Sequence, residues 1–216
     1  MEAVMKERWK TIRTAVWMIV YVILGVWLYV QLMKYFDLPQ VMLIAPVLGA
    51  AAMLMLKKKS FFVLAGTILI SCLYQILAGN ANAVARLQTN VESVSGILLR
   101  CLSVLLLFEL AGMGGGALIR MLPDKDKRMY IRVISCVLGI LLIAGPYVAM
   151  FRNPIYPILA KKQLKNYAEE HFTDYPMAGK MVYFSMQDSE YICRVLMADG
   201  QIRVVGFDEA GNAVQQ

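Results

Sequence analysis

The chain has 216 residues, of which 59% are hydrophobic and 17% charged, whereas soluble domains carry about 25% charged residues. This composition excludes an ordinary water-soluble globule. A net charge of +7 is also found in nucleic-acid-binding proteins, but from Pro154 onward the chain holds six basic and eight acidic residues, so the excess positive charge lies in the apolar part. A nucleic-acid partner is therefore not expected.

Five apolar stretches occupy residues 1–152, and each has at least 19 residues, close to the roughly 20 that a helix needs to cross a bilayer. They are residues 14–32, 38–56, 60–78, 95–119 and 133–151. Pro46 interrupts the second stretch, but neighbouring helices make a proline tolerable in a membrane helix. The sequence predicts an α-helical multi-pass membrane protein with five transmembrane helices and the lipid bilayer as its first partner.

Basic residues gather before the first stretch, between the second and third, and between the fourth and fifth. These clusters contain Lys6, Arg8, Lys10, Arg13, Lys57, Lys58, Lys59, Arg120, Lys125, Lys127, Arg128 and Arg132. The alternate connections hold only Lys34 and Arg86, with Arg100 near the entry of the fourth stretch. Because short loops rich in Lys and Arg stay in the cytoplasm, we expect the N-terminus inside and the C-terminal tail outside the cytoplasm.

The connection after the third stretch contains a helical pattern. Val84, Leu87, Val91 and Val94 recur at spacings of three and four, with polar residues between them. This pattern predicts a short helix between residues 79 and 95 that lies on the outer membrane surface. A second interpretation makes it a rim over a site between the helices.

Glu109 lies near the middle of the fourth stretch, where inserting a charged side chain costs roughly 2.5 to 3.5 kcal/mol and such a residue usually faces a bundle interior. Depth counted from the midpoint of each stretch places Tyr21 and Thr67 at the same level. We therefore expect a hydrogen-bonded polar cluster of these three residues, extended outward by Ser71 and Gln75. Glu109 then either ties the helices together in its protonated form or binds a proton or an ion.

Small residues end the fourth stretch. Gly112 and Gly116 form a G-x-x-x-G pair, and Ala111 and Gly115 repeat the spacing one residue earlier. The glycines also match a dinucleotide-binding turn, but that motif needs a preceding strand and a following soluble helix. We expect them to allow close helix packing, with the small residues 49–52 of the second stretch as the partner face.

Residues 153–216 predict a small α+β domain. Apolar spacing indicates a helix over residues 158–171, in which Lys165 and Glu169 form an i,i+4 pair. Alternating runs follow at 181–187, 191–198 and 201–207, and Asp199 with Gly200 is a two-residue hairpin signal. One helix on a three-stranded antiparallel meander is expected, because an isolated hairpin needs a covering layer.

The tail begins Arg152-Asn-Pro, continues with a Lys-rich helix that ends Tyr167-Ala-Glu-Glu-His-Phe, and then carries Tyr183-Phe-Ser-Met and Tyr191-Ile-Cys-Arg-Val. In these segments it resembles the YfjL-like family of small extracytoplasmic domains of Gram-positive bacteria. The resemblance covers about the last 64 residues and implies a bacterial, exported module without an activity that could be carried over. His171-Phe172 departs from the usual family pattern, and the family typically has one membrane anchor.

No catalytic constellation is visible in the tail. His171 is the single histidine of the chain, and Glu170, His171 and Asp174 form too loose a set for a metal site. Neither Ser185 nor Cys193 has an evident basic partner. We therefore predict no enzyme activity, no metal and no cofactor.

Two functions from different classes remain. In the first, the helices display a small extracytoplasmic module that binds or senses a protein or envelope partner. In the second, the protein is a small-solute or ion transporter, or the membrane subunit of one, with Glu109 in the path.

Overall fold

The computed structural model describes residues 2–35, 37–78, 94–122, 129–151, 153, 155–172, 177–185 and 188–216. The chain divides into two compact units. The helical unit comprises Met1–Met33 and Gln40–Tyr147, and the C-terminal unit comprises Lys34–Pro39 together with Val148–Gln216. The short segment that joins the first two apolar stretches thus belongs to the same unit as the tail.

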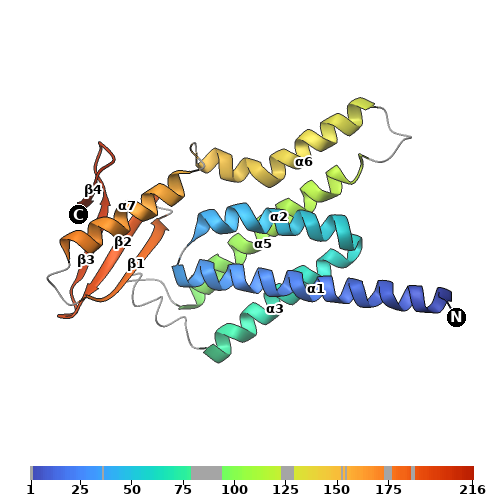
Figure 1. Ribbon diagram of the computed structural model, residues 1–216, viewed down its shortest axis with the longest axis horizontal. Coiled ribbons are helices and arrows are strands. Elements are labelled where there is room, and N and C mark those ends of the chain that lie inside the picture. The colour runs from blue at the N-terminus through green and yellow to red at the C-terminus, as the bar shows by residue number, and fades with distance from the viewer. Residues whose placement is uncertain are drawn as a thin grey trace. The chain divides into compact units, whose positions relative to one another are not determined.

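Long apolar helices cover all five predicted stretches (Figure 1). They are α1 (Glu2–Tyr35), α2 (Leu38–Leu56), α3 (Ser60–Ala78), α5 (Val94–Ile119) and α6 (Met129–Met150), with the short 3-10 helix η1 (Lys57–Lys59) between α2 and α3. Four described helices are long and apolar enough to cross a membrane when Leu38–Leu77 is taken as one run of 40 residues. Their composition is consistent with membrane insertion. The surface helix predicted between residues 79 and 95 lies outside the described residues, except that Val94 and Ser95 begin α5.

The run from α2 to α3 reverses direction at the three lysines (Figure 1). Lys57 has a left-handed backbone with φ of 57°, and Ser60 Oγ donates a hydrogen bond to the Lys57 carbonyl at 2.6 Å. Beyond the turn, Val63 of α3 packs in a buried cluster with residues of α1 and α2: Tyr21, Ala52 and Leu56. Each arm of this hairpin has 19 residues, the length of a single crossing.

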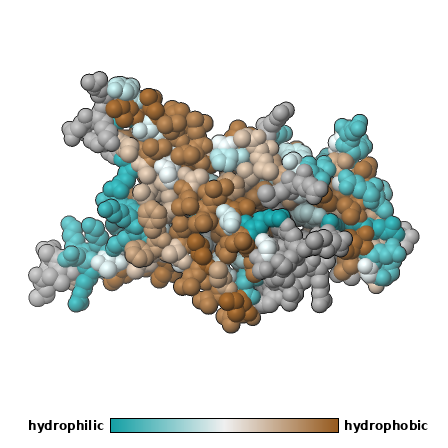
Figure 2. Space-filling model, turned by 180° about the vertical axis from the view of Figure 1, so that it is seen from behind, coloured by the Kyte–Doolittle hydropathy of each residue, from teal (hydrophilic) through white to brown (hydrophobic). Residues whose placement is uncertain are grey.

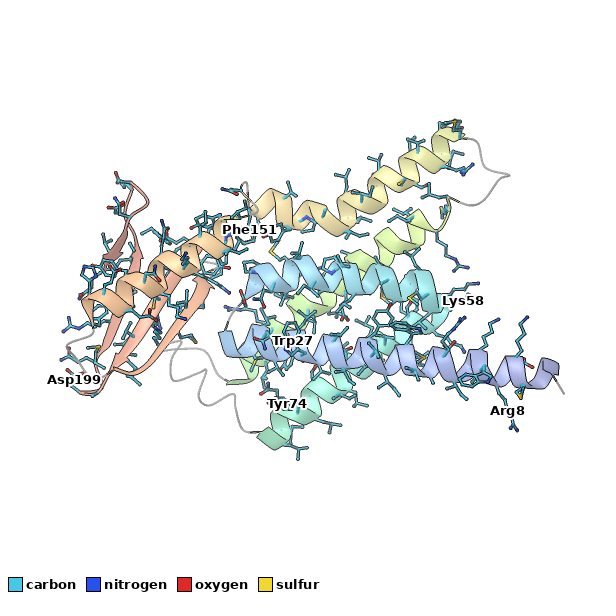
Figure 3. The ribbon with its side chains drawn as sticks, viewed as in Figure 1. Arg8, Trp27, Lys58, Tyr74, Phe151 and Asp199 are labelled. Atoms are coloured by element: carbon cyan, nitrogen blue, oxygen red, sulfur yellow. The ribbon has the colours of Figure 1, made fainter. Side chains whose placement is uncertain are left out.

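Basic residues mark one end of the helical unit. Arg8 and Lys58 lie toward this end, whereas Tyr74 lies toward the opposite one (Figure 3). The C-terminal end of α5, which precedes Arg120, lies at the basic end as well (Figure 1). Side chains between the two ends are largely apolar on the outside (Figure 2). The alternating charge pattern of the sequence therefore corresponds to two differently charged ends of one helical unit.

The C-terminal unit places one helix on an antiparallel sheet (Figure 1). Helix α7 (Tyr156–His171) is followed by β1 (Met177–Ser185), β2 (Glu190–Met197), β3 (Ile202–Phe207) and β4 (Ala213–Gln215), paired in the order β1-β2-β3-β4. The sequence predicts three strands, and the fourth corrects that prediction. Strand β4 has three residues, too few to show an alternating pattern, and a turn with Gly211 at φ of 81° brings it back to β3.

The turn between β2 and β3 also differs from its prediction. Gly200 has φ of 83°, but Asp199 does not have a positive φ, as a two-residue type I′ turn would require. Instead Gly200 N–H donates to the Met197 carbonyl at 3.0 Å, and Met197 N–H donates to the Gln201 carbonyl at 2.9 Å. Asp199 Oδ1 accepts a hydrogen bond from Gln201 N–H at 2.8 Å, which favours this longer loop.

The core of the C-terminal unit lies between α7 and the sheet. Leu164 and Ala168 of α7 are fully buried, as are Val195 of β2 and Val205 of β3. An edge-to-face contact joins Phe184 of β1 to Tyr191 of β2, with ring centroids 5.3 Å apart. Aromatic and aliphatic packing holds this unit together, as expected of a domain whose single cysteine cannot form an internal disulfide.

Candidate functional site

Helix α3 buries polar side chains along one face. Thr67, Ser71 and Gln75 follow one another at four-residue spacing, and each is at least nine-tenths buried; Ser60, at the start of the same helix, is fully buried as well. Residues at this spacing share a helix face, and the distance from Ser60 to Gln75 is about 22 Å at 1.5 Å per residue. We use the name polar seam for these four residues together with Tyr21 and Tyr29 of α1 and Glu109 of α5.

Gly25 of α1 makes room for the centre of the polar seam. A Cβ atom at this glycine would lie 2.7 Å from Thr67 Oγ1 and 3.0 Å from Glu109 Oε1. The Thr67 hydroxyl and the Glu109 carboxyl therefore meet against the backbone of α1, and Glu109 is only 4% exposed. A lone glycine in an apolar stretch gives no local signal of this role, so sequence analysis missed it.

The structure brings Glu109, Tyr21 and Thr67 together, but the hydroxyl groups bond elsewhere. The Tyr21 hydroxyl lies 3.1 Å from Met55 Sδ, and Thr67 Oγ1 donates to the Val63 carbonyl at 2.9 Å. A hydroxyl has one proton to donate, so these bonds replace those expected with the carboxyl. Among the described residues, Glu109 has no ion pair and no side-chain hydrogen bond.

A small cavity adjoins Glu109 on the side of the basic end. Its lining includes Tyr21 and Ser60 with apolar neighbours from α2, α3 and α5, and its volume is about 10 Å³. A cavity of this size has room for about one water molecule. The cavity therefore extends the polar seam from Glu109 toward the turn between α2 and α3.

The other side of Glu109 holds buried polar atoms without hydrogen bonds. Tyr29 Oη, Ser71 Oγ and Gln75 Oε1 are all inaccessible and have no hydrogen-bond partner among the described residues. The Gln75 side chain and the thiols of Cys72 and Cys101 interact with the Tyr29 hydroxyl, although Gln75 does not reach hydrogen-bond geometry. Each buried polar group left without a partner costs about 1 to 3 kcal/mol, so such a group marks a place for water or a ligand.

Tyr29 is a seam residue that sequence analysis missed. It is fully buried, and it lies four residues after Gly25 and eight after Tyr21 on α1. This spacing could have indicated a common helix face. Near the end of a membrane span, however, a tyrosine is more typical of an interfacial anchor.

Close packing between α2 and α5 holds Glu109 in place. A Cβ atom at Gly112 would overlap the Pro46 carbonyl, and one at Gly116 would lie 2.7 Å from the Ala50 carbonyl oxygen. From the other side, a Cβ atom at Gly49 would overlap the Glu109 carbonyl. The backbones of the two helices approach so closely that only glycine fits these positions.

The second small-residue pair of α5 lies on a different side of the helix. A Cβ atom at Gly115 would lie 2.7 Å from the Gly139 carbonyl oxygen of α6. Ala111 is half-buried. The four residues singled out for helix packing therefore do not form one face, because Gly115 adjoins α6 whereas Gly112 and Gly116 adjoin α2.

The C-terminal unit carries a groove beside the end of α7. The groove has a volume of about 650 Å³ and is lined by His171, Phe172, Met197, Ala198, Asp199, Arg203 and Gln215. The His171 ring stacks on Tyr167 with centroids 3.9 Å apart, which fixes one wall. Asp199 lies at the tip of the β2–β3 turn (Figure 3). The lining of the groove combines apolar side chains with charged groups of both signs.

An ion pair joins distant parts of the C-terminal unit. Lys161 Nζ of α7 lies 2.6 Å from Asp37 Oδ1, and Asp37 is only 4% exposed. The same ammonium group lies 5.6 Å from the centre of the Tyr191 ring. The two ionised residues are 124 positions apart in the chain, so no local pattern could have predicted their contact.

The C-terminal unit offers little for nucleophilic or metal chemistry. Cys193 is fully buried, and burial raises the pKa of its thiol to about 11. The thiol therefore stays protonated and weakly nucleophilic at neutral pH. In the part of the chain that the structure describes, no group of three or more His, Cys, Asp or Glu side chains is placed to hold a metal ion.

No family model, curated protein or solved structure matches this chain. The likeness of the tail to the YfjL-like family therefore stays a prediction. Function has to be inferred from the polar seam, the groove and the ion pair.

Proposed function

We propose that this protein is a multi-pass membrane protein that displays its C-terminal unit outside the cytoplasm as a non-catalytic binding or sensing module. The groove beside α7 carries this proposal. It combines apolar Phe172 and Met197 with the charged groups of Asp199 and Arg203, and ligand sites typically have apolar walls with a few polar groups that orient the ligand. A peptide or another envelope component that carries both charges suits such a groove.

The ion pair between Asp37 and Lys161 supports a sensing role. It ties α7 to the segment Lys34–Pro39, and this segment continues directly into α1 and α2 along the chain. A change in α7 on ligand binding would therefore reach the ends of two membrane helices through one contact. We propose that this contact is the relay between the module and the membrane.

Site-specific photocross-linking in cells that produce the full chain tests the binding function. A photoreactive residue is placed at Arg203 or Gln215 in the groove, or at exposed Lys162 of α7 as the matched control. A discrete adduct at the groove positions and none at Lys162 is the expected result. No adduct at either groove position, or the same adducts at all three, would contradict a binding groove.

A reporter active only outside the cytoplasm, fused after Gln216, tests the orientation. The basic end of the helical unit predicts an exported C-terminus, and therefore a signal. A matched fusion of a reporter active only in the cytoplasm should stay silent. The reverse outcome would make the C-terminal unit a cytoplasmic regulatory domain.

A second proposal is a transport role, with a path for a small solute or ion near Glu109. The polar seam favours it, because membrane helices bury ionisable residues where an ion pathway or a proton relay runs. Deletion of residues 153–216 removes the groove and spares the polar seam, whereas Glu109→Gln does the opposite. The two variants therefore separate the two proposals in any functional assay.

A further inference from the structure

The polar seam continues on both sides of Glu109. Toward the basic end, the cavity beside the carboxyl reaches Tyr21 and Ser60. Toward the opposite end, Thr67 lies against the same glycine as the carboxyl, and Ser71 and Gln75 follow on the same face of α3. The four polar residues of α3 thus extend over about 22 Å, most of the roughly 30 Å of a bilayer's hydrocarbon core.

We propose that Glu109 is a proton-binding site that exchanges its proton along the polar seam. This inference rests on the second proposal above, which it deepens by naming the proton as the species bound. It does not depend on the C-terminal module.

The space beside Glu109 favours a proton over a larger ligand. The cavity of about 10 Å³ admits about one water molecule and no organic solute. A metal cation would need several oxygen ligands around it, but the lining of the cavity offers side-chain oxygens only from Tyr21, Ser60 and Glu109 among the described residues. A proton needs a single carboxylate oxygen and no coordination shell.

The unpartnered atoms beyond Thr67 supply the exchange route. Tyr29 Oη and Ser71 Oγ can each donate and accept a hydrogen bond, and Gln75 Oε1 can accept one. Water bound between these atoms would receive the proton from the carboxylic acid and leave a carboxylate. Each hydroxyl or water in the route takes one proton and gives one, so charge and atoms balance without an oxidant or a reductant.

The other titratable groups near the seam come from three helices. Helix α1 presents Tyr21 and Tyr29, α3 presents Cys72, and α5 presents Cys101. The described residues of α2 that line the cavity, Leu48, Gly49 and Ala52, do not titrate, and the lysines of η1 are exposed. In the described part of the seam, Glu109 is therefore the one carboxyl group that can change charge.

Infrared difference spectroscopy of the full chain in liposomes tests the proposal. The carbonyl stretch of a protonated carboxylic acid in an apolar site is followed while the pH is raised. We expect a band that disappears at alkaline pH and is absent from Glu109→Gln. Ser103→Ala is the matched control, because Ser103 is on α5 and donates its hydroxyl proton to the Leu99 carbonyl of its own helix. It should leave the band unchanged.

The exchange route has its own readout. After a jump from H₂O to D₂O, the Glu109 band shifts as its proton exchanges, and Ser71→Ala combined with Gln75→Leu should slow that shift about tenfold. Ser103→Ala should not slow it. If Glu109→Gln fails to fold, Glu109→Asp replaces it, and the band should then move to the frequency of the new carboxyl group.

Three outcomes would overturn the proposal. The first is a Glu109 carbonyl band that persists at every pH at which the chain stays folded. The second is the same pH-dependent loss of the band in Glu109→Gln as in the wild-type chain. The third is a rate of proton exchange at Glu109 that Ser71→Ala combined with Gln75→Leu does not change. The wider ion-path proposal fails separately, if liposomes with the wild-type chain leak Na⁺ and K⁺ no faster than those with Glu109→Gln.

Discussion

Both units bury apolar side chains, but the helical unit also buries a row of polar ones and exposes large apolar ones. In the helical unit, Thr67, Ser71 and Glu109 lie inside, whereas Ile76 is 78% and Leu77 is 84% exposed. In the C-terminal unit, aliphatic residues such as Leu164 lie inside, and the described charged residues apart from Asp37 are exposed or partly exposed. Figure 2 shows the apolar exterior of the helices on one face.

The difference is consistent with lipid around the helical unit and water around the C-terminal unit. Lipid tails are as apolar as leucine, so a membrane bundle loses little by leaving large apolar side chains on its exterior, and small and polar residues can lie where its helices meet. In water, apolar burial is the dominant favourable term, at about 25 cal/mol per Å². The four predictions below test this contrast, beginning with the largest expected effect.

Leucine truncation should matter most where water is the solvent. Leu164→Ala leaves a cavity under α7 and should destabilise the C-terminal unit by about 2 to 5 kcal/mol. Leu159→Ala, on the same helix but 50% exposed, should change stability by less than about 0.5 kcal/mol. Hydrogen exchange of the β2 amides in the full chain measures both. If Leu164→Ala and Leu159→Ala lost the same amount of stability, the C-terminal unit would have no apolar core of the kind that stabilises water-soluble domains.

Adding one methyl group should matter most inside the helical unit. Gly112→Ala forces a Cβ atom into the Pro46 carbonyl and should cost about 1 to 3 kcal/mol. Gly114→Ala places its Cβ 3.8 Å from Leu142 and should be neutral. The fraction of each variant that stays monodisperse after heating in detergent measures the difference. A heat-resistant Gly112→Ala would argue against close contact of α2 and α5.

The ion pair should respond unequally to loss of its two partners. Lys161→Met leaves Asp37 charged and buried, so it should cost about 1 to 2 kcal/mol. Asp37→Asn should cost less, because the Lys161 side chain is 31% exposed and can reach water. Exposed Lys162→Met is the control. Hydrogen exchange of α7 measures all three, and the reverse order would mean that Asp37 is not held as a buried charge.

The smallest effect should come from the exposed pair of Glu169 and Lys180. The Lys180 ammonium holds the pKa of Glu169 below its usual value. Because the folded-state pKa is the lower one, the pair stabilises the fold above the unfolded-state pKa, and this contribution is lost as the pH falls through the folded-state pKa.

Glu169→Gln should therefore lower stability slightly at neutral pH and leave it unchanged below the folded-state pKa of Glu169, so that the acid side of the stability profile becomes flatter. The thermal midpoint of the amide infrared band of the sheet, recorded against pH, measures this effect. Glu209→Gln, in the exposed turn before β4, is the control. If Glu169→Gln and Glu209→Gln flattened the stability profile equally, the effect could not be assigned to the contact between Glu169 and Lys180.

Local pattern predicts most elements of both units. Length and apolarity mark the five helical stretches, and the spacing of apolar residues marks α7 and the first three strands, because these features depend on neighbours in the chain. The helix α7 begins at Tyr156, slightly before its predicted start, since Pro157 is well suited to a first helical turn. Strand β4 is missed because its pairing with β3, and not its own pattern, makes it a strand.

The sequence indicates some residues of the polar seam but not others. Glu109, Thr67, Ser71 and Gln75 stand out because polar residues are rare in apolar stretches. Tyr29 and Gly25 do not stand out, because a tyrosine and a glycine are ordinary in a membrane helix. Their part in the polar seam follows only from the side of α1 that meets α3 and α5.

The sequence by itself therefore determines which segments are apolar helices, where their basic ends lie and what kind of domain follows them. The tertiary structure decides that Asp37 binds Lys161, that Glu169 bonds Lys180 and not Lys165, and that the glycines of α5 adjoin two different helices. The physical reason is that the sequence of a helix that is apolar on all sides does not indicate which side will be buried. Ion pairs between distant segments, likewise, exist only once packing has brought their backbones together.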